Sequence, residues 1–536
     1  MATEKRNIIE RALHAITPNA WRATPVAHVP VQKPSAIFGF NGTYNHIFSV
    51  GFDGEKSPGQ MGTPKDYYLD IYSLRIRSRQ AYLENEIAKT VIDKAARWII
   101  SSGLKLQCNP DEVVLASEGI NIKKEAFNEI TERRFAVWAR SKTATFNAQQ
   151  SFNKLARMAY RESKLVGDVL VILRVQNGWP TVELVDTNSL ITPPGELSNP
   201  LFRNGVEVDE RGRHIAYHIR RQLFDTLWGY KYERVDAYSA KTGLRLAYLV
   251  YGSEFRIGDT RGLPVIAVVL ETLQKLERYK TATVSSAEEV AKNPYQITHD
   301  QNSTGESPLD VVTASILSNN GTDNNGEAAL RELITKITST TNNQVYNMPI
   351  GAKMEGVEYK GTLSFTEFYN TNADKICGVV NIPPNVAFSI YNDSFSASRA
   401  ATKDWEHTMD TEREDFGEQF YQPIYALLTY LELLKGKIPA PGLLEFYRTK
   451  NQMGIDAYLA FRVTGPKFPH IDPLKEVKAE RAKLGPLFDN VPLTTLEAAT
   501  EALSGGDGDS NMQQAAEELT EFRSMKLEPS PKPTTA

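Results

Sequence analysis

Residues 261–287 read RGLPVIAVVLETLQKLERYKTATVSSA and predict a long helix, from about Pro264 to Lys292. Pro264 fits the first turn of a helix and Pro294 follows its end, and both positions tolerate proline. At about 1.5 Å per residue, this helix would be about 43 Å long. Along one face, the first half of this helix has apolar side chains at spacings of three and four, and the second half has small or polar ones. The positions on this face are Ile266, Val269, Leu273, Leu276, Lys280, Thr283 and Ala287. Such a face favours packing beside a second copy of the helix, and a peripheral helix of an enzyme domain is the alternative.

The composition around this helix is that of a globular protein. The chain has 536 residues, of which 41% are hydrophobic and 24% charged. This length predicts about three to five structural units. Sixty-one Lys and Arg residues against 65 Asp and Glu residues give a net charge of −4. A protein that holds DNA tightly usually has an excess of cations, so the composition leaves room only for a local basic patch.

Cysteine usage and hydropathy indicate the compartment. Cys108 and Cys377 lie far apart in the sequence, which excludes a disulfide framework and a CxxC site and indicates a reducing cytosol. Residues 1–21 mix charged residues among the apolar ones and do not form a signal peptide. The longest apolar run, residues 263–270, is much shorter than the about 20 residues that a bilayer span needs. We therefore expect a cytosolic product that does not cross a membrane.

Motifs for catalysis or metal binding are not found in the sequence. It has no phosphate-binding loop, dinucleotide-binding glycine motif, HExxH or GxSxG. His214 and His218 are four residues apart, but their segment predicts a strand, in which such residues are about 13 Å apart. That distance is too long for one metal ion unless the strand bends. Paired carboxylates, such as Asp111-Glu112, Glu288-Glu289 and Glu517-Glu518, lie in polar stretches typical of solvated helix faces. The sequence thus predicts no enzyme, no metal and no cofactor.

The first half of the chain predicts an α+β unit. Residues 1–65 are polar and rich in turn-forming residues, which predicts an extended N-terminal arm. Helices are then expected over about residues 70–102, 123–141 and 148–167. One β-hairpin is predicted around Asn177-Gly178, and a second pairs residues 203–209 with 214–219.

The second half predicts a small module between long helices. Asn, Thr, Ser and Gly crowd the start of residues 293–363, which predicts a separate α/β module there. A helix over about Phe365–Val380 is expected to end at Pro383-Pro384, because proline disrupts a helix. A flexible polar loop follows, and Arg399 to about Gly436 predicts another helix with a kink at Pro423. Residues beyond Gly505 predict a flexible tail with one short helix.

In this order of elements the chain resembles the lambda-type portal proteins of tailed bacteriophages, from about Leu74 to Leu527. The resemblance rests on six motifs: LRIRSRQAYLENEIAKTVIDKAARWIISSGLKLQ (74–107), RNGVEVDERGRHIAYHI (203–219), RGLPVIAVVLETLQKLERYKTATVSSA (261–287), VVNIPPNVAFSIYNDSFSASRAA (379–401), QPIYALLTYLELLKGKIPAP (422–441) and DPLKEVKAERAKL (472–484). Each motif is short and catalytically silent, but their shared order indicates the family. Val268 replaces a proline usual in the family, and residues 1–65 and 246–260 depart from its pattern.

The resemblance implies a portal protein fold assembled as a homo-oligomeric ring, usually of twelve subunits, at one vertex of the capsid. Such a ring contacts the major capsid protein, binds the large terminase subunit during packaging, passes double-stranded DNA without sequence specificity, and then carries the head–tail adaptor. It is assembled in the cytoplasm of the bacterial host and becomes part of the virion. The implied domains are an N-terminal arm (1–65), wing (66–262 and 399–469), stem helices (263–292 and 364–382), clip (293–363), tunnel loop (383–398), crown (470–505) and C-terminal tail (506–536).

The resemblance also implies which residues face DNA and which face a neighbouring subunit. The DNA-facing residues of the tunnel loop and the following helix would be Asn385, Ser389, Tyr391, Asn392, Asp393, Ser394, Ser396, Ser398, Arg399 and Lys403. The stem residues between subunits would be Ile266, Val269, Leu273, Leu276 and Lys280. Serine and asparagine contact phosphates weakly and read no bases. Twelve chains at −4 each would carry −48, which fits a channel that must not grip DNA. An exposed loop without DNA contacts is the alternative.

Two other functions remain open on the residues alone. One is a soluble enzyme with an α+β core and no recognisable catalytic motif, and the other is a monomeric phage head or ejection protein.

Overall fold

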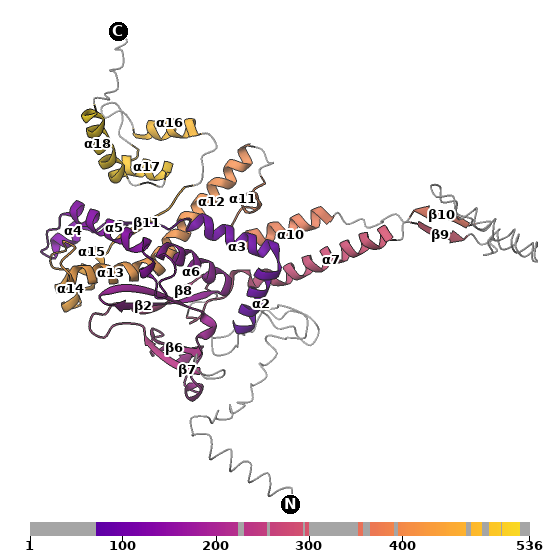
Figure 1. Cartoon of the computed structure of the whole chain (residues 1–536), viewed down its shortest axis with the longest axis horizontal. Helices are drawn as coiled ribbons and strands as arrows, with labels where there is room; N and C mark the ends of the chain where they lie inside the picture. The colour runs from indigo at the N-terminus through magenta and orange to yellow at the C-terminus, as the bar shows by residue number, and fades with distance from the viewer. Residues whose placement is uncertain are drawn as a thin grey trace, which may run out of the picture. The chain divides into compact units, whose positions relative to one another are not determined.

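The computed structural model describes residues 71–222, 230–254, 258–292, 295–299, 352–356, 365–390, 395–467, 473–484, 493–504, 506 and 508–525 (Figure 1). The chain divides into a larger unit, formed by residues 1–273 and 372–536, and a smaller unit, residues 274–371. The N-terminal arm and most of the module predicted at residues 293–363 lie outside the described residues. None of the described helices is both long enough and apolar enough to span a bilayer.

Most strands of the larger unit form one run between two runs of helices, which confirms the α+β class. Its first part contains α2 (Ile71–Glu84), α3 (Glu86–Ile99), β1 (Lys105–Cys108), α4 (Glu112–Ser117), α5 (Lys124–Arg140), α6 (Phe152–Val166), β2 (Asp168–Gln176), β3 (Trp179–Val185), β4 (Phe202–Arg203), β5 (Val206–Val208), β6 (His214–Gln222), β7 (Tyr230–Asp236) and β8 (Ala247–Tyr251). Its second part contains α11 (Pro384–Phe388), α12 (Phe395–Phe416), a π-helical turn (Gly417–Tyr421), α13 (Gln422–Leu434), α14 (Leu443–Thr449), α15 (Gln452–Tyr458), β11 (Phe461–Thr464), α16 (Pro473–Leu484), α17 (Leu496–Ser504) and α18 (Gly508–Ser524).

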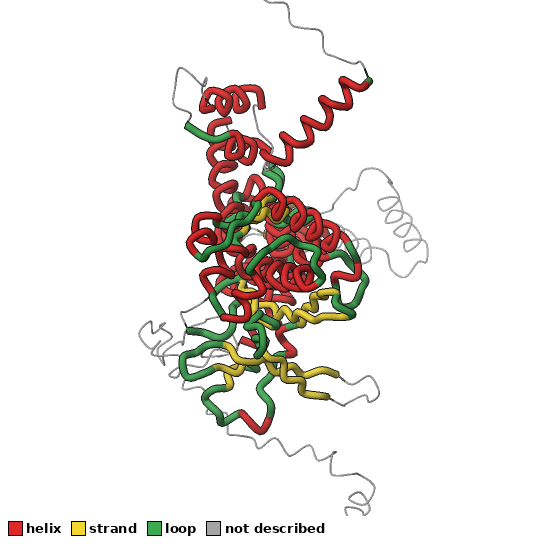
Figure 2. Tube along the Cα trace, turned by 90° about the vertical axis from the view of Figure 1, so that its left-hand side faces the viewer, coloured by secondary structure: helices red, strands yellow, loops and turns green. Residues whose placement is uncertain are grey.

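Two antiparallel sheets pack face to face beneath a layer of helices. The sheet orders are β3-β2-β8 and β4-β5-β6-β7. Figure 1 shows these two sheets below helices α5, α6 and α13, and Figure 2 shows most of the strands below the helices of this body. Alternate residues of β2 and β8 point into the core between the sheets, which contains Leu170, Ile172, Val185, Leu190, Val206, Val208, Tyr217, Ile219, Ala237, Ala247 and Leu249. The intervening residues of β2, such as Val169 and Val171, are also buried, so this strand is covered on both faces.

Asparagine–glycine pairs make the tight turns of both sheets. Asn177 and Gly178 have φ values of 53° and 72° and join β2 to β3, as the sequence predicts. Asn204 and Gly205, with φ values of 49° and 84°, join β4 to β5. The sequence predicts one strand over residues 203–209. This prediction is wrong, because Asn204 and Gly205 reverse the chain direction between β4 and β5.

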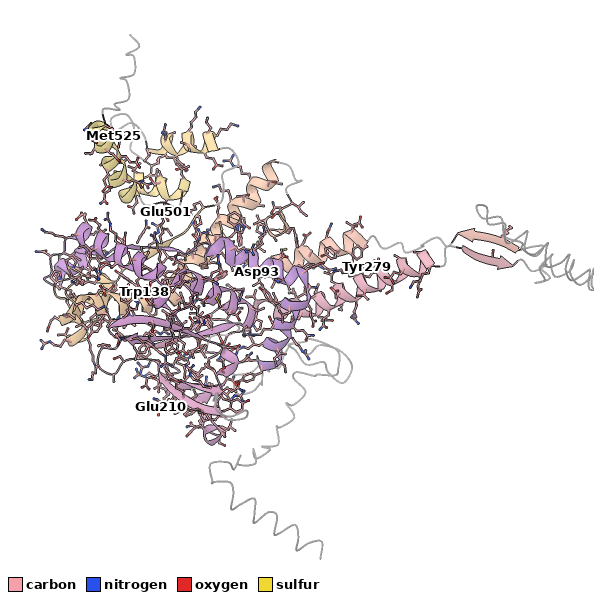
Figure 3. All side chains as sticks on the ribbon, viewed as in Figure 1. Asp93, Trp138, Glu210, Tyr279, Glu501 and Met525 are labelled. Atoms are coloured by element: carbon pink, nitrogen blue, oxygen red, sulfur yellow. The ribbon has the colours of Figure 1, made fainter. Side chains whose placement is uncertain are left out.

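The helical layer is built around a cluster of aromatic rings. Phe152 of α6 stacks on Phe420 at 5.6 Å, and Trp138 of α5 lies 4.9 Å from Phe152 between ring centroids. Phe416 stacks on Phe420 at 4.9 Å, and the hydroxyl of Tyr248 in β8 donates to the carbonyl of Phe420 at 3.0 Å. Figure 3 labels Trp138 among these side chains. The cluster therefore joins the helices to the three-stranded sheet.

A π-helical turn interrupts the helix predicted from Arg399 to Gly436. The helix begins at Phe395, and the backbone N–H of Gln422 donates to the carbonyl of Gly417, five residues earlier. Pro423 follows directly in the first turn of α13 and has no N–H to donate. Because Pro423 cannot donate, the regular hydrogen bond to the residue four positions earlier is lost there. The helical pattern therefore changes next to the proline at which the sequence predicts a kink.

Two other helix predictions need correction. The single helix expected over residues 70–102 is two helices, because the Asn85 side chain accepts from the N–H groups of Ile87 and Ala88 and starts α3. The helix expected from Pro264 begins as a 3₁₀ turn over Val265–Val269, and α7 proper spans Leu270–Lys292. Its 23 residues give a length of about 34 Å. The helices predicted at 123–141 and 365–380 are confirmed as α5 and α10 (Phe365–Val379).

The smaller unit contains most of α7, the antiparallel pair β9 (Tyr295–His299) and β10 (Ala352–Gly356), and the start of α10. Tyr279 of α7 lies 4.6 Å from the ring of Phe368 and stacks on Phe365 at 5.7 Å. Figure 3 labels Tyr279 on α7. These contacts place α7 beside the first turn of α10.

A buried carboxylate holds the segment that leads into α7. Asp168, at the start of β2, accepts from Arg75 Nη2 of α2 at 2.8 Å and from Arg261 Nε at 2.8 Å. The backbone N–H of Gly262 also donates to Asp168, at 2.8 Å. All three charged side chains are at most 1% exposed. Burial alone would raise the pKa of Asp168, but the guanidiniums of Arg261 and Arg75 hold it below its ordinary value.

Glycines allow this close approach of backbones. A Cβ atom on Gly262 would lie 2.1 Å from the carbonyl oxygen of Gly167, and one on Gly252 would lie 2.1 Å from that of Ser163. Gly167 has a φ of 102° and accepts a hydrogen bond from the N–H of Gly252 at 2.8 Å. Larger residues at these positions would push the segment 258–264 away from Asp168.

Replacing Asp168 by asparagine should therefore destabilise the larger unit strongly. The change leaves two buried guanidiniums without a charged partner, and removal of one member of a buried ion pair typically costs about 3–5 kcal/mol. Because the folded pKa of Asp168 is lowered, its contribution is present above the unfolded pKa of about 3.9 and is lost as the pH falls through the folded pKa. Thermal or urea unfolding of both proteins, measured from neutral to acid pH, checks this.

Asp209→Asn is the matched control. Asp209 also accepts from an arginine, Arg213, at 2.7 Å, but this pair is on the surface, with the Arg213 side chain 77% exposed. Its loss should change the unfolding midpoint little, because solvent screens exposed ion pairs. Equal effects of the two substitutions would show that the Asp168 cluster is not special.

Candidate functional site

The candidate site is the chain between α10 and α12, where the DNA-facing loop is expected. α10 ends at Val379, and the N–H of Ile382 donates to the carbonyl of Cys377 at 3.1 Å. Asn381 adopts a φ of 57° in this turn. Pro383 and Pro384 then start the short helix α11, because proline fits the first turn of a helix.

The loop expected over residues 383–398 is shorter than predicted. Val386 and Ala387 of α11 are fully buried, and α11 packs against α3. Ser389, with a φ of 57°, ends α11, and the described exposed stretch begins there with Ser389 and Ile390. The prolines and the two buried apolar residues favour a turn of helix over a flexible loop, which is why residues 383–388 depart from the prediction.

The predicted polar DNA-facing residues fall into four groups. Asn385 lies inside α11, where its carbonyl accepts from the N–H of Ile390 at 3.0 Å. Ser389 is exposed, and its Oγ lies 2.8 Å from the ammonium of Lys94 on α3. Ser396 and Ser398 belong to the first turn of α12 and not to a loop. Tyr391, Asn392, Asp393 and Ser394 lie outside the described residues.

The two predicted cations of α12 each have an acidic partner. Lys403 Nζ lies 2.6 Å from a carboxylate oxygen of Glu406, one turn along the helix. Arg399 Nη2 lies 3.7 Å from a carboxylate oxygen of Glu476 on α16. α12 as a whole has three basic residues against six acidic ones, namely Asp404, Glu406, Asp410, Glu412, Glu414 and Asp415. The start of this helix is therefore less positive than Arg399 and Lys403 alone indicate.

The residues predicted to lie between stem helices are largely buried within one chain. Ile266, Val269, Leu273 and Leu276 are at most 5% exposed, whereas Val268 is 70% exposed and Val284 of α7 is 52% exposed. The apolar spacing of three and four therefore marks the face of this segment that is covered in a single chain. The second half of α7, which is small and polar, is mostly exposed.

His214 and His218 each contact a neighbouring polar side chain, and Cys377 is buried. His214 Nδ1 lies 2.9 Å from the Tyr217 hydroxyl, and burial, followed by the charge of Arg245, lowers the pKa of His214 to about 4. His218 Nε2 lies 3.0 Å from a Glu207 carboxylate oxygen. Burial raises the pKa of the Cys377 thiol to about 12, so this thiol is protonated at neutral pH. In the described part of the chain, no three His, Cys, Asp or Glu side chains are grouped to hold a metal ion.

The sequence analysis did not identify the Asp168 cluster. Arg75 belongs to the motif at residues 74–107, and Arg261-Gly262 begins the motif at residues 261–287. Arg75 has Arg77 and Arg79 close by in the sequence, and Arg261 follows Asp259-Thr260, so neither is marked by its neighbours as part of a buried ion pair. Their common partner could not be found from the sequence, because Asp168 is 93 residues from each.

Comparison with protein families decides the identity. Residues 55–413 match the model of the phage portal protein, lambda family. The chain belongs to this portal protein family. The match spans α2 to most of α12 and so includes the Asp168 cluster, the whole of α7 and the candidate site. It confirms the resemblance carried by the sequence motifs.

Solved structures that match the chain come from gene transfer agent (GTA) particles. The neck of a native GTA particle computed with C12 symmetry matches with a TM-score of 0.40 and 11% identity, covering 81% of the portal chain and 93% of that chain. The virion of a native gene transfer agent particle matches with a TM-score of 0.39 and 12% identity, over 81% and 93%. Both TM-scores are low, and the family membership rests on the sequence match.

Two apolar truncations test where the exposed segment begins. Val386→Ala should destabilise the larger unit by about 2 kcal/mol, because it removes two buried methyl groups and leaves a cavity. Ile390→Ala, four residues later at a side chain that is 55% exposed, should change stability by less than about 0.5 kcal/mol. Urea unfolding of the two variants measures both values, and equal effects would contradict the boundary at Ser389.

Proposed function

We propose that the chain forms the portal ring at one vertex of a phage capsid, through which double-stranded DNA enters and leaves. The family match over residues 55–413 carries this proposal. The ring would contain about twelve copies, bind the terminase during packaging and the head–tail adaptor afterwards, and touch the major capsid protein at its outer edge. It would be assembled in the host cytoplasm and remain in the virion.

The proposed domains follow the two units of the chain. The sandwich of sheets and its helical layer, residues 66–262 and 399–469, would form the wing. Residues 263–292, which include α7, and residues 364–382, which include α10, would form the stem, residues 293–363 the clip, and residues 383–398 the tunnel loop. α16 and α17 would form the crown, and α18 would belong to the C-terminal tail. The exposed, small and polar face of the second half of α7 supports a stem helix that packs beside its copy in the next subunit.

The charge distribution supports passage of DNA without tight binding. Tight binding requires cations that neutralise phosphates, and each such contact makes the affinity fall with salt. Arg399 and Lys403 have acidic partners, and Lys94 is hydrogen-bonded to Ser389. Twelve chains at −4 each would carry −48. We therefore infer a channel that repels the DNA backbone on average and touches it only through weak polar contacts around Ser389.

The mass of the assembly tests the ring. Light scattering after size-exclusion chromatography should give about twelve times 59.9 kDa, or about 719 kDa, or another ring multiple. Negative-stain images of the same fractions should show rings with a central hole. A protein that stays at 60 kDa up to micromolar concentrations, also when co-expressed with capsid protein, would favour a monomeric head or ejection protein.

The tunnel loop is tested by replacing Asn392, Asp393 and Ser394 together with glycine. Rings should form with unchanged mass, whereas DNA packaging or retention should fall, because the loop loses its polar side chains and gains backbone freedom. A packaging assay with nuclease-protected DNA measures the second effect. Failure of ring formation, or full packaging by the variant, would contradict the assignment of the loop.

A further inference from the structure

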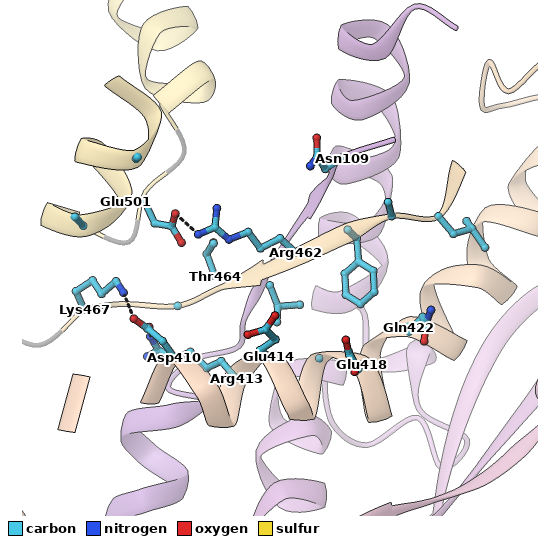
Figure 4. Close-up of a pocket in the computed structure, with 18 of the residues that line it drawn as sticks. Asn109, Asp410, Arg413, Glu414, Glu418, Gln422, Arg462, Thr464, Lys467 and Glu501 are labelled. Atoms are coloured by element: carbon cyan, nitrogen blue, oxygen red, sulfur yellow. Dashed lines mark hydrogen bonds and ion pairs between the residues drawn. The ribbon is translucent and has the colours of Figure 1, made fainter. Parts of the chain in front are cut away.

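Helix α18 is anchored at its start and uncovered from residue 511 onward (Figure 1). Gly508 is buried, and a Cβ atom there would lie 2.8 Å from the Cα atom of Glu497 in α17. α17 is in turn held to β11 by the ion pair between Glu501 and Arg462, which a dashed line marks in Figure 4. By contrast, residues 511–525 are all exposed.

A stripe of apolar side chains runs along the exposed part of α18. Its members recur at spacings of three and four and therefore share one face of the helix: Met512, Ala515, Ala516, Leu519 and Phe522. The three larger side chains are 49–51% exposed. A helix of 17 residues gains most of its stability by packing such a face, and contiguous exposed apolar surface is typical of interaction sites. The stripe therefore has no partner within the described part of its own chain.

The stripe follows the seven-residue repeat of a coiled coil, whose positions are named abcdefg. Met512 and Leu519 occupy position a of two successive repeats, and Ala515 and Phe522 occupy position d. Side chains at a and d insert between the side chains of a second helix. The repeat therefore indicates that another helix covers the stripe.

Two opposite charges border the stripe. Glu518 occupies position g, and Arg523 occupies position e of the following repeat. Five residues along a helix differ by about 140° around its axis, so the two side chains lie on different sides of the stripe. Among the residues that the structure describes, neither has an ion-pair partner, and Glu518 accepts only from the neutral amide of Gln514, at 3.0 Å.

These charges identify the second helix as α18 of another copy of the chain, in parallel orientation. In parallel helices, position g of one helix faces position e of the following repeat in the other, so Glu518 of one copy meets Arg523 of the next. Antiparallel helices would instead bring Glu518 against Glu518. Rotation about one axis relates the subunits of a ring, so equivalent helices run in the same direction along that axis.

We propose that α18 packs in parallel against α18 of each neighbouring subunit, and that Glu518 of one copy pairs with Arg523 of the next. Each helix offers its Glu518 side to one neighbour and its Arg523 side to the other. Such a contact joins two different surfaces, and it therefore continues around a ring and does not stop at a dimer. The inference rests on the proposed ring for the number of neighbours.

Disulfide cross-linking of the full-length variant Glu518→Cys/Arg523→Cys tests this contact. The two natural cysteines, Cys108 and Cys377, are both buried, so the introduced pair supplies the exposed thiols. Within one helix the introduced thiols cannot bridge, because their backbones are about 7.5 Å apart along the axis. Oxidation of the assembled protein should therefore give a ladder of covalent multimers larger than the dimer.

Three further variants separate the stripe from accidental collisions. Glu517→Cys/Ser524→Cys places a second cysteine pair on the opposite face of α18 and should give no ladder. Leu519→Glu, added to the first cysteine pair, should lower the cross-link yield several-fold, because it brings a charge into the stripe. Gln513→Glu adds the same charge on the polar face and should leave the yield unchanged.

Light scattering on the same samples separates this contact from the ring itself. Rings of the expected mass that give no ladder would overturn the α18 contact and leave the proposed function standing. A monomer that does not cross-link would contradict both. Products that stop at the dimer, or dimers of the single variant Glu518→Cys, which antiparallel helices would give, would also overturn the proposal. If a different protein covers the stripe, the purified chain gives no ladder, and the proposal is wrong.

Discussion

The carboxylate of Asp168 is the constraint on which the larger unit depends. It joins the start of β2, helix α2 and the segment before α7. The last two also meet in an apolar cluster of Ile71, Leu74, Leu263 and Ala267. The two guanidiniums carry one unit of charge more than the single carboxylate neutralises. Backbone carbonyls therefore accept further hydrogen bonds from both arginines. Arg75 donates to the carbonyls of Val166 and Gly262, and Arg261 to those of Asn204 and Thr187. Buried ions need such hydrogen bonds, and among the described residues Nη1 of Arg75 is the one side-chain nitrogen or oxygen atom of this cluster without a partner.

The predictions that succeeded rest on local chemistry. Asn177-Gly178 predicts its hairpin because few other residue pairs adopt the positive φ angles that the turn needs. Helices α5 and α10 follow from their own apolar spacing and end signals. The break at Asn85 was missed because apolar spacing continues across it, although asparagine is a common N-cap. The short helix α11 differs from the predicted loop because its five residues stand between a pair of prolines and a polar stretch, both of which also predict a loop.

The contacts that could not be predicted join residues far apart in the chain. β1 pairs with β11, so that Lys105 is opposite Thr464, and neither strand has a partner near it in sequence. The composition also does not show which of the charged side chains are paired in the fold. Arg399 and Lys403 count as cations in the composition, but Glu476 and Glu406 neutralise them in the fold. For a portal protein, the charges that stay unpaired in the fold matter more than the net charge of the sequence.

The π-helical turn changes the direction in which the side chains after it point around the helix axis. One extra residue in a turn advances every later side chain by about 100° around the axis. Phe416 lies before this turn and Phe420 within it, and the two rings stack on each other in the cluster around Phe152. Deleting one residue from Gly417–Tyr421 would restore a regular helix, but it would rotate α13 away from the sheet that it covers. The irregular turn thus sets the angular register between two regular helices.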